Sequence, residues 1–140
     1  MIRAISVLVC LFILATSANA LSLKNKDRQQ IINLESTNLE YNLGSVGKDK
    51  IINRTIKIRN KLEETLVISK VRSTCECIKI YAKPQILDRG GIFEIEIAFD
   101  TTGINYGTNV EEVVYILTDN MDYEFIRLVI LATIVDSKPR

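Results

Sequence analysis

Two cysteines separated by a single residue, Cys75 and Cys77, are the side chains of this sequence best suited to chemistry. They lie in the stretch STCECI, whereas the third cysteine, Cys10, lies in a hydrophobic segment near the amino terminus. A pair of thiols can form a disulfide, take part in thiol–disulfide exchange, bind a soft metal ion or pack as small apolar side chains. The choice depends on the local backbone, the other ligands and the compartment.

The local backbone disfavours a relaxed disulfide. In an extended strand, Cys75 and Cys77 would point to the same face, with Cα atoms about 6.5–7 Å apart, the outer limit for a disulfide. Joining the sulfur atoms requires a kink, which glycine would ease and Glu76 makes harder. Because so small a loop adds little stability, we expect any disulfide here to be reducible and suited to redox chemistry.

A metal site needs more ligands than this pair supplies. Zinc takes four ligands, usually cysteine or histidine, and the chain contains no histidine. Copper(I) accepts two thiolates, but Met121, the only methionine after the first residue, lies on a distant predicted turn. We therefore name no metal ligand and no cofactor. A local or mixed disulfide, inert packing and, last, a thiolate metal site remain open for Cys75 and Cys77.

The absence of histidine also limits catalysis. Histidine is the commonest general base at neutral pH, so triads that pair it with serine or cysteine are excluded. The adjacent acidic pairs Glu63-Glu64 and Glu111-Glu112 are interpreted as solvated strand ends or turns, without the facing geometry of glycosidase carboxylates. We name no catalytic residue and predict that the protein is not an enzyme.

The first twenty residues have the features of a signal peptide. Arg3 provides a positive start, residues 5–15 are hydrophobic apart from Ser6, and Ala18-Asn19-Ala20 fits a small-x-small cleavage site. The hydrophobic run is shorter than the roughly 20 residues that span a bilayer. We expect export to the periplasm, the cell envelope or the exterior, with no stable membrane span after cleavage. An uncleaved membrane anchor is the alternative.

The charge balance points away from nucleic acid. Cleavage would remove Arg3 and leave equal numbers of acidic and basic side chains, interspersed along the chain. Nucleic-acid-binding proteins carry a basic block or face, and none is visible in the sequence. We therefore expect no nucleic-acid partner. The predicted export and the lack of a catalytic constellation make an unidentified protein of the cell envelope the expected partner.

The rest of the chain has the size of one domain and alternates apolar and polar side chains, as strands exposed on one face do. Turn residues interrupt the pattern at 44–47, 88–91 and 119–122, and no segment holds a capped helical period. We predict an all-β, immunoglobulin-like two-sheet sandwich of about seven strands. The strands are expected at residues 39–43, 52–59, 65–71, 78–81, 93–99, 112–118 and 125–135.

The domain boundaries follow from this pattern. The sandwich is expected at residues 37–136, followed by a tail at 137–140. Residues 21–36 are polar and are expected to be a flexible lead-in. The short apolar set Ile31, Ile32 and Leu34 offers an alternative, in which this segment begins a first edge strand.

Five motifs in order resemble the bacterial domain-of-unknown-function 1573 family. They are YNLGSV at 41–46, IKIRN at 56–60, LVISKVRSTCEC at 66–77, GIFEIEIAFD at 91–100 and the turns near Asn105 and Asn120. The resemblance implies an immunoglobulin-like sandwich related to Hydin-like and major-sperm-protein-like domains, usually exported and without an assigned enzymatic activity. This chain departs from the family pattern, with Glu76 for glycine, Ile78 for threonine and Asp88-Arg89 for Pro-Gly.

These observations favour an exported, non-enzymatic immunoglobulin-like domain of the cell envelope that acts as a protein–protein interaction or structural module. The alternative is a thiol–disulfide redox or copper-handling protein that works through Cys75 and Cys77.

Overall fold

A computed structural model describes residues 30–136. The predicted signal peptide at residues 1–20, most of the lead-in and the tail at 137–140 lie outside the described residues, so these assignments stay predictions.

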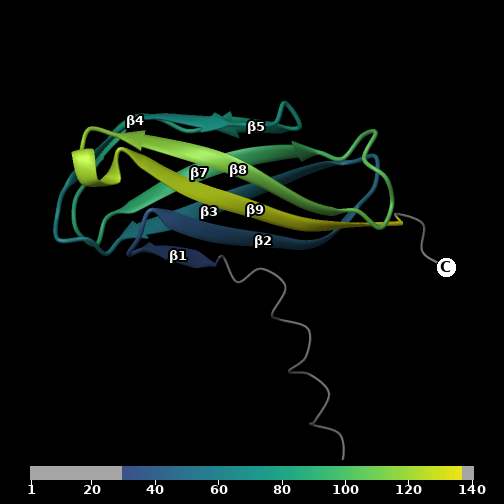
Figure 1. The fold of residues 1–140 in the computed structure, drawn as a ribbon, viewed down its shortest axis with the longest axis horizontal. Helices are drawn as coiled ribbons and strands as arrows, with labels where there is room; N and C mark the ends of the chain where they lie inside the picture. The colour runs from purple at the N-terminus through teal and green to yellow at the C-terminus, as the bar shows by residue number, and fades with distance from the viewer. Residues whose placement is uncertain (1–29, 137–140) are drawn as a thin grey trace, which may run out of the picture.

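The described chain forms two packed β-sheets (Figure 1). The first sheet has the order β1 (Ile31–Leu34), β3 (Ile51–Asn60), β7 (Ile92–Asp100) and β5 (Ile78–Tyr81). The second has the order β2 (Asn38–Gly47), β9 (Phe125–Val135), β8 (Asn109–Thr118), β4 (Leu66–Ser73) and β6 (Gln85–Leu87). A short 3-10 helix, Met121–Tyr123, joins β8 to β9. The prediction of an all-β, immunoglobulin-like sandwich is confirmed.

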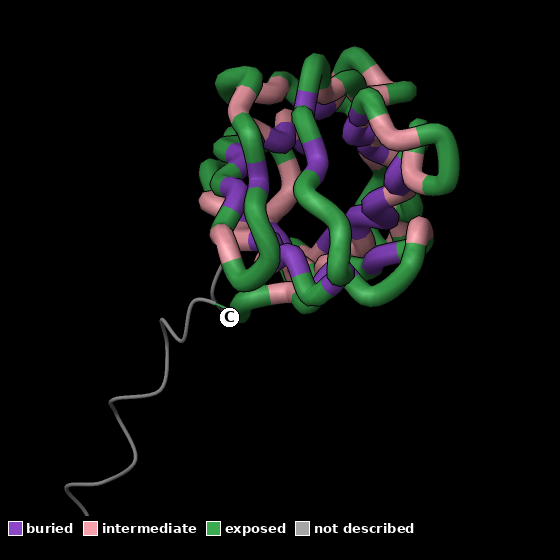
Figure 2. Tube along the Cα trace, turned by 90° about the vertical axis from the view of Figure 1, so that its left-hand side faces the viewer, coloured by how far each residue is buried: buried purple, intermediate pink, exposed green. Residues whose placement is uncertain are grey.

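The hydrophobic core lies between the sheets because each strand turns alternate side chains inward. Ile126, Leu128, Ile130, Ala132 and Ile134 of β9 are all buried, as the sequence pattern predicted. The apolar row of β7 that contains Phe93 and Phe99 is buried in the first sheet. Figure 2 shows this alternation as purple segments between green ones along the strands.

Two strands exceed the predicted seven. Ile31–Leu34 pairs in parallel with β3 and buries Leu34. This part of the expected flexible lead-in is therefore an edge strand, which was the alternative prediction for the segment. Gln85–Leu87 directly follows Pro84 and pairs with β4 at the edge of the second sheet. Proline is tolerated at this position because the chain is crossing from one sheet to the other and needs no ladder hydrogen bond there.

The turn predicted at residues 44–47 is wrong, because β2 runs through it. Gly44 adopts a φ of +71°, and the register with β9 shifts between Asn42 and Ser45. Such a bulge changes which residues face inward, so Leu39 is buried before it and Val46 after it. A glycine in a strand signalled a turn or a bulge, and only the pairing with β9 distinguishes them.

Within the described residues, no helix has the length and hydropathy needed to cross a membrane.

Candidate functional site

Cys75 and Cys77 form a disulfide in the turn that carries the chain from β4 to β5, and so from one sheet to the other. Their Cα atoms lie 5.1 Å apart, closer than the roughly 6.5–7 Å of an extended strand, because the chain is kinked here as a bridge requires. The main-chain N–H of Ile78 donates to the Cys75 carbonyl at 3.3 Å, and the Cys75 N–H donates to the Ser73 hydroxyl at 3.1 Å. These bonds hold the kink that the disulfide needs.

The kink forms without glycine, although we expected Glu76 to make it harder. The only non-glycine residue with a positive φ among those described is Asp49, so Glu76 adopts an ordinary backbone conformation. Glu76 is exposed, and the two cysteines are half-buried. The replacement of the family's glycine by Glu76 is therefore compatible with the bridge, because the turn demands no left-handed residue.

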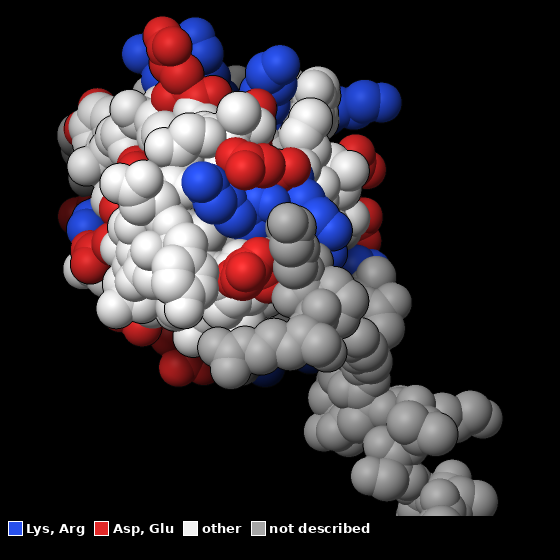
Figure 3. All heavy atoms as spheres, turned by 90° about the vertical axis from the view of Figure 1, so that its right-hand side faces the viewer, with Lys and Arg blue, Asp and Glu red and all other residues white. Residues whose placement is uncertain are grey.

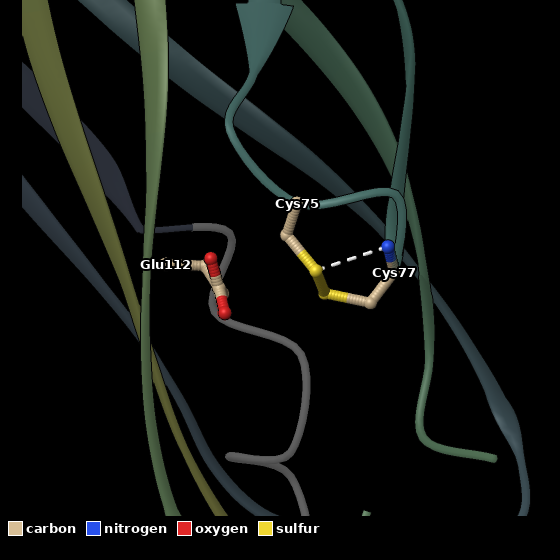
Figure 4. Close-up of side chains that lie close together, drawn as sticks. All are labelled: Cys75, Cys77 and Glu112. Atoms are coloured by element: carbon tan, nitrogen blue, oxygen red, sulfur yellow. Dashed lines mark hydrogen bonds between the residues drawn. A yellow bond between two sulfur atoms is a disulfide. The ribbon is translucent and has the colours of Figure 1, made fainter. Parts of the chain in front are cut away.

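The structure adds Glu112 of β8 to this pair (Figure 4). One carboxylate oxygen of Glu112 and the two sulfur atoms all lie within 4.8 Å of one another. The contact arises because β4 pairs with β8: Ser73 lies opposite Val114, and the N–H of Thr74 donates to the Val113 carbonyl at 3.0 Å. Sequence reasoning missed Glu112 because this register cannot be deduced from alternation alone.

Glu111 and Glu112 occupy different environments, although we predicted a solvated pair. Glu111 points outward and lies 3.6 Å from the Arg127 guanidinium. Glu112 continues the inward row of β8, ahead of the buried Val114 and Ile116, and is half-buried. The prediction is therefore wrong for Glu112. Met121 is almost fully exposed on the 3-10 helix and takes no part in this site.

A shallow hollow of about 490 Å³ lies beside Cys77, lined in part by Lys79 and Asp100. A hydrogen bond from the Thr102 side chain and one from its main-chain N–H, at 2.9 Å, hold the pKa of Asp100 below its ordinary value of 3.8. The main-chain N–H of Asp100 donates to the Cys77 carbonyl at 2.8 Å, so the backbone of this residue joins the end of β7 to the disulfide turn.

The lowered pKa of Asp100 predicts a pH dependence of stability. Its contribution is present in full above the unfolded-state pKa and is lost as the pH falls through the lower folded-state value. Between about pH 5 and pH 2, the free energy of unfolding should fall more steeply for the wild type than for Asp100→Asn. Urea unfolding at several pH values measures this difference. Thr102→Val, which removes only the side-chain hydrogen bond, should give an intermediate slope, and equal slopes for all three proteins would contradict the assignment.

A second feature is an open edge on β7. β5 pairs with β7 only from Glu96 to Phe99, so the Ile92–Ile95 half of β7 has a strand partner on its β3 side alone. A groove of about 750 Å³ lies along this open half. Its lining includes apolar, acidic and basic side chains, namely Ile80, Tyr81, Ala82, Lys83, Gln85, Ile92, Glu94 and Glu96.

Main-chain groups of β7 are directed into this groove. The N–H of Asp100 donates to Cys77 on the β5 side, and the Ile92 carbonyl accepts a hydrogen bond from the Gln85 side chain at 3.2 Å. Alternation along the strand then directs the main-chain groups of Glu94 to the same side, beyond the end of β5. A polypeptide in the groove could continue the ladder at this point.

The end of the molecule at the right of Figure 1 carries charged side chains of both signs. Figure 3 shows acidic and basic side chains next to one another on that face, without a broad region of one sign. This distribution agrees with the balanced composition of the chain.

Most of the chain matches a known protein family. Residues 34–134 match the family described as protein of unknown function, DUF1573. The chain belongs to the DUF1573 family. The resemblance of the sequence motifs is thereby confirmed, and DUF1573 membership itself assigns no activity. No curated protein sequence matches the chain.

Solved structures share the fold of this DUF1573 domain. A protein of unknown function from Porphyromonas gingivalis W83 is 17% identical, with a TM-score of 0.53 over 80% of this chain and 51% of that chain. Secreted serine protease VesC from Vibrio cholerae is 9% identical, with a TM-score of 0.52 over 70% of this chain and 22% of that chain.

A third similar structure is SSP-19, an MSP-domain protein like family member in Caenorhabditis elegans. It is 17% identical, with a TM-score of 0.42 over 69% of this chain and 94% of that chain. At these identities the likeness concerns the fold alone. The DUF1573 chain spans 51% of the Porphyromonas protein and 22% of the protease.

Proposed function

We propose that this DUF1573 domain is an exported, non-enzymatic module of the cell envelope that binds a protein partner at the open edge of β7. The observation that carries this proposal is the coincidence of unpaired strand edge and groove along Ile92–Ile95. An extended segment of the partner would add a strand in line with β5, a common mode of peptide recognition by β-sheets. The signal-peptide features of residues 1–20 support export.

The side chains around the groove suit such a partner. Tyr81 is 60% exposed and Ile92 is 39% exposed, and both lie in the groove lining. The neighbouring Ile86 of β6 is 67% exposed. A partner strand would cover part of this apolar surface and would hydrogen-bond to the main chain of Glu94, which together provide affinity and register.

The proposal predicts that small changes in the groove abolish capture of the partner. The double variant Tyr81→Ser/Ile92→Ser should recover at least about tenfold less partner from a cell-envelope extract than the wild type, because the main apolar contacts are lost. Phe125→Ser is the matched control, because Phe125 is also 52% exposed but lies on β9, outside the groove lining. Hydrogen exchange measured with the recovered partner should show slowed exchange at the Glu94 amide.

Equal recovery by the groove variant and the wild type would place the binding surface elsewhere. Failure to recover any partner, together with turnover of a substrate by the purified protein, would reject the non-enzymatic binding role altogether. Circular dichroism of both variants checks that a loss of capture is not a loss of folding.

A second candidate function, thiol–disulfide exchange or copper handling, is supported by the accessibility of the Cys75–Cys77 bridge. The bridge is half-buried, and it closes a loop of three residues, worth about 1.6 kcal/mol in the chain-entropy treatment. A bridge with so small a stabilising effect can be opened by an external thiol. Titration of the protein thiols against graded glutathione buffers gives the reduction potential of the Cys75–Cys77 pair. A role in thiol–disulfide exchange requires that this potential lie near the redox potential of the compartment.

A further inference from the structure

We infer that the reduced protein binds a zinc ion through the Cys75 and Cys77 thiolates and the Glu112 carboxylate. The site goes beyond the partner-binding role, which uses the groove along β7. Its basis is the convergence of three ligand atoms of types that zinc accepts, from two segments far apart in the chain, within 4.8 Å of one another.

The distances suit a tetrahedral site once the disulfide is opened. Zinc–sulfur bonds of about 2.3 Å and zinc–oxygen bonds of about 2.0–2.2 Å place tetrahedral ligand atoms roughly 3.5–3.8 Å apart. The carboxylate of Glu112 therefore needs to approach the sulfur atoms by no more than about 1.3 Å, while the two sulfur atoms move apart from bonding contact. A water molecule would take the fourth position, as in zinc sites with three protein ligands.

The environment of Glu112 also favours a cation. Its carboxylate lies on the inward row of β8, half-buried, and has no ion pair or hydrogen bond to any residue within 30–136. A half-buried carboxylate without a partner is costly, and a bound cation would offset that cost. Glu111, by contrast, points outward and has a cationic partner, since it lies near the guanidinium of Arg127.

The turn stabilises the thiolate form of the ligands. The main-chain N–H of Cys77 points at the Cys75 sulfur atom, 3.0 Å away, as the dashed line in Figure 4 shows. An N–H directed at sulfur stabilises negative charge on a metal-bound thiolate and fixes its orientation. Cys77 also packs against the hydrophobic core, which holds the second sulfur atom in place.

The chemistry requires an external dithiol as reductant. The dithiol transfers two electrons and two protons to the Cys75–Cys77 bridge, the sulfur–sulfur bond breaks, and the dithiol becomes a disulfide. Zinc then displaces the two thiol protons and binds the two thiolates and the carboxylate. The Glu112 oxygen distinguishes this site from a pure thiolate pair: copper(I) prefers soft sulfur, whereas zinc also accepts a carboxylate oxygen.

The test compares zinc binding by reduced and oxidised protein. The full mature chain is reduced with a phosphine, desalted without oxygen and titrated with zinc against a chromophoric chelator. We expect one zinc per reduced chain and none in the oxidised protein. Glu112→Gln should weaken binding at least about tenfold, and Glu111→Gln should leave it unchanged. Cobalt(II) in place of zinc should give a sulfur-to-metal charge-transfer band that Cys75→Ser/Cys77→Ser removes.

Three outcomes would overturn the inference. The first is reduced wild-type protein that binds no zinc, and the second is Glu112→Gln that binds zinc as tightly as the wild type. The third is a site that takes copper(I) but no zinc, which would assign it to the thiolates alone. Circular dichroism of each variant confirms that the sandwich is folded, so that weak binding reports on the ligands.

Discussion

Replacement of Phe99 by alanine should destabilise the domain by about 3–5 kcal/mol, a large part of the roughly 5–15 kcal/mol that holds a typical domain folded. Phe99 is 0% exposed in the central strand β7, where Ile52 of β3 lies opposite on one side and Ile78 of β5 on the other. The truncation removes buried apolar surface and leaves a cavity that the flanking strands can fill only in part.

Chemical denaturation of the wild type and Phe99→Ala measures this loss. Phe125→Ala is the matched control, because Phe125 is 52% exposed and its truncation should cost less than about 1 kcal/mol. Similar losses for the two variants would mean that Phe99 is not part of a tightly packed core. Because Ile78 directly follows the cysteine turn, we also expect faster thiol labelling of reduced Phe99→Ala than of the reduced wild type.

Replacement of Asn60 by alanine is the second large effect, a loss of about 2–4 kcal/mol. The Asn60 side chain is fully buried at the end of β3. It donates hydrogen bonds to the carbonyls of Glu64 at 2.8 Å and Leu87 at 3.0 Å, and it accepts one from the N–H of Leu62 at 3.0 Å. Alanine would leave three main-chain groups without these partners in a site poor in water, at about 1–3 kcal/mol for a fully unsatisfied group.

The control for Asn60 is on the same strand. Asn53 is exposed, and Asn53→Ala should change the free energy of unfolding by no more than about 0.5 kcal/mol. Asn60→Asp should also be destabilising, since an ionised carboxylate cannot donate to the two carbonyls. If Asn60→Ala unfolds at the same denaturant concentration as Asn53→Ala, water must replace the side chain and the proposed clamp is absent.

Asn60 and Phe99 stabilise opposite ends of the sandwich. The N–H of Asn60 donates to the carbonyl of Gly91, just before β7, whereas Cys77 lies beside Asp100 at the end of β7. Asn60 joins the end of β3 to the connection before β4 and to β6, and Phe99 lies beside the strand that follows the cysteine turn. Phe99, and not Asn60, is therefore the residue that packs beside the cysteine turn. A loss of packing at Phe99 should loosen the cysteine turn, whereas a loss at Asn60 should act on the opposite end of the sandwich.

Much of the fold could be predicted from the sequence because strand alternation is a local property. The buried row of β9, from Ile126 to Ile134, follows directly from a two-residue period of apolar side chains. The expected strands around Phe93–Phe99 and at the carboxyl end are present for the same reason. The cysteines were also identified as the candidate site, because their type and spacing need no tertiary information.

Only the tertiary structure decided the features that depend on pairing between distant segments. Gly44 indicates a turn in the sequence, whereas its place beside β9 in the structure shows that it marks a bulge in β2. Asn60 is only the last residue of the IKIRN motif in the sequence, and the fold shows that its side chain donates to the buried carbonyl of Leu87. The sequence predicts that Glu112 is one of two solvated acidic residues, whereas the register of β4 with β8 places it beside the cysteines.

The physical reason is the same in each case. Alternation determines which side chains share a face of a strand, whereas register and sheet order determine which residues of other strands they meet. The sequence by itself therefore determined the β-sandwich class, most of the core and the thiol pair. The kinked turn, the third ligand and the open edge of β7 were decided by how the strands pair.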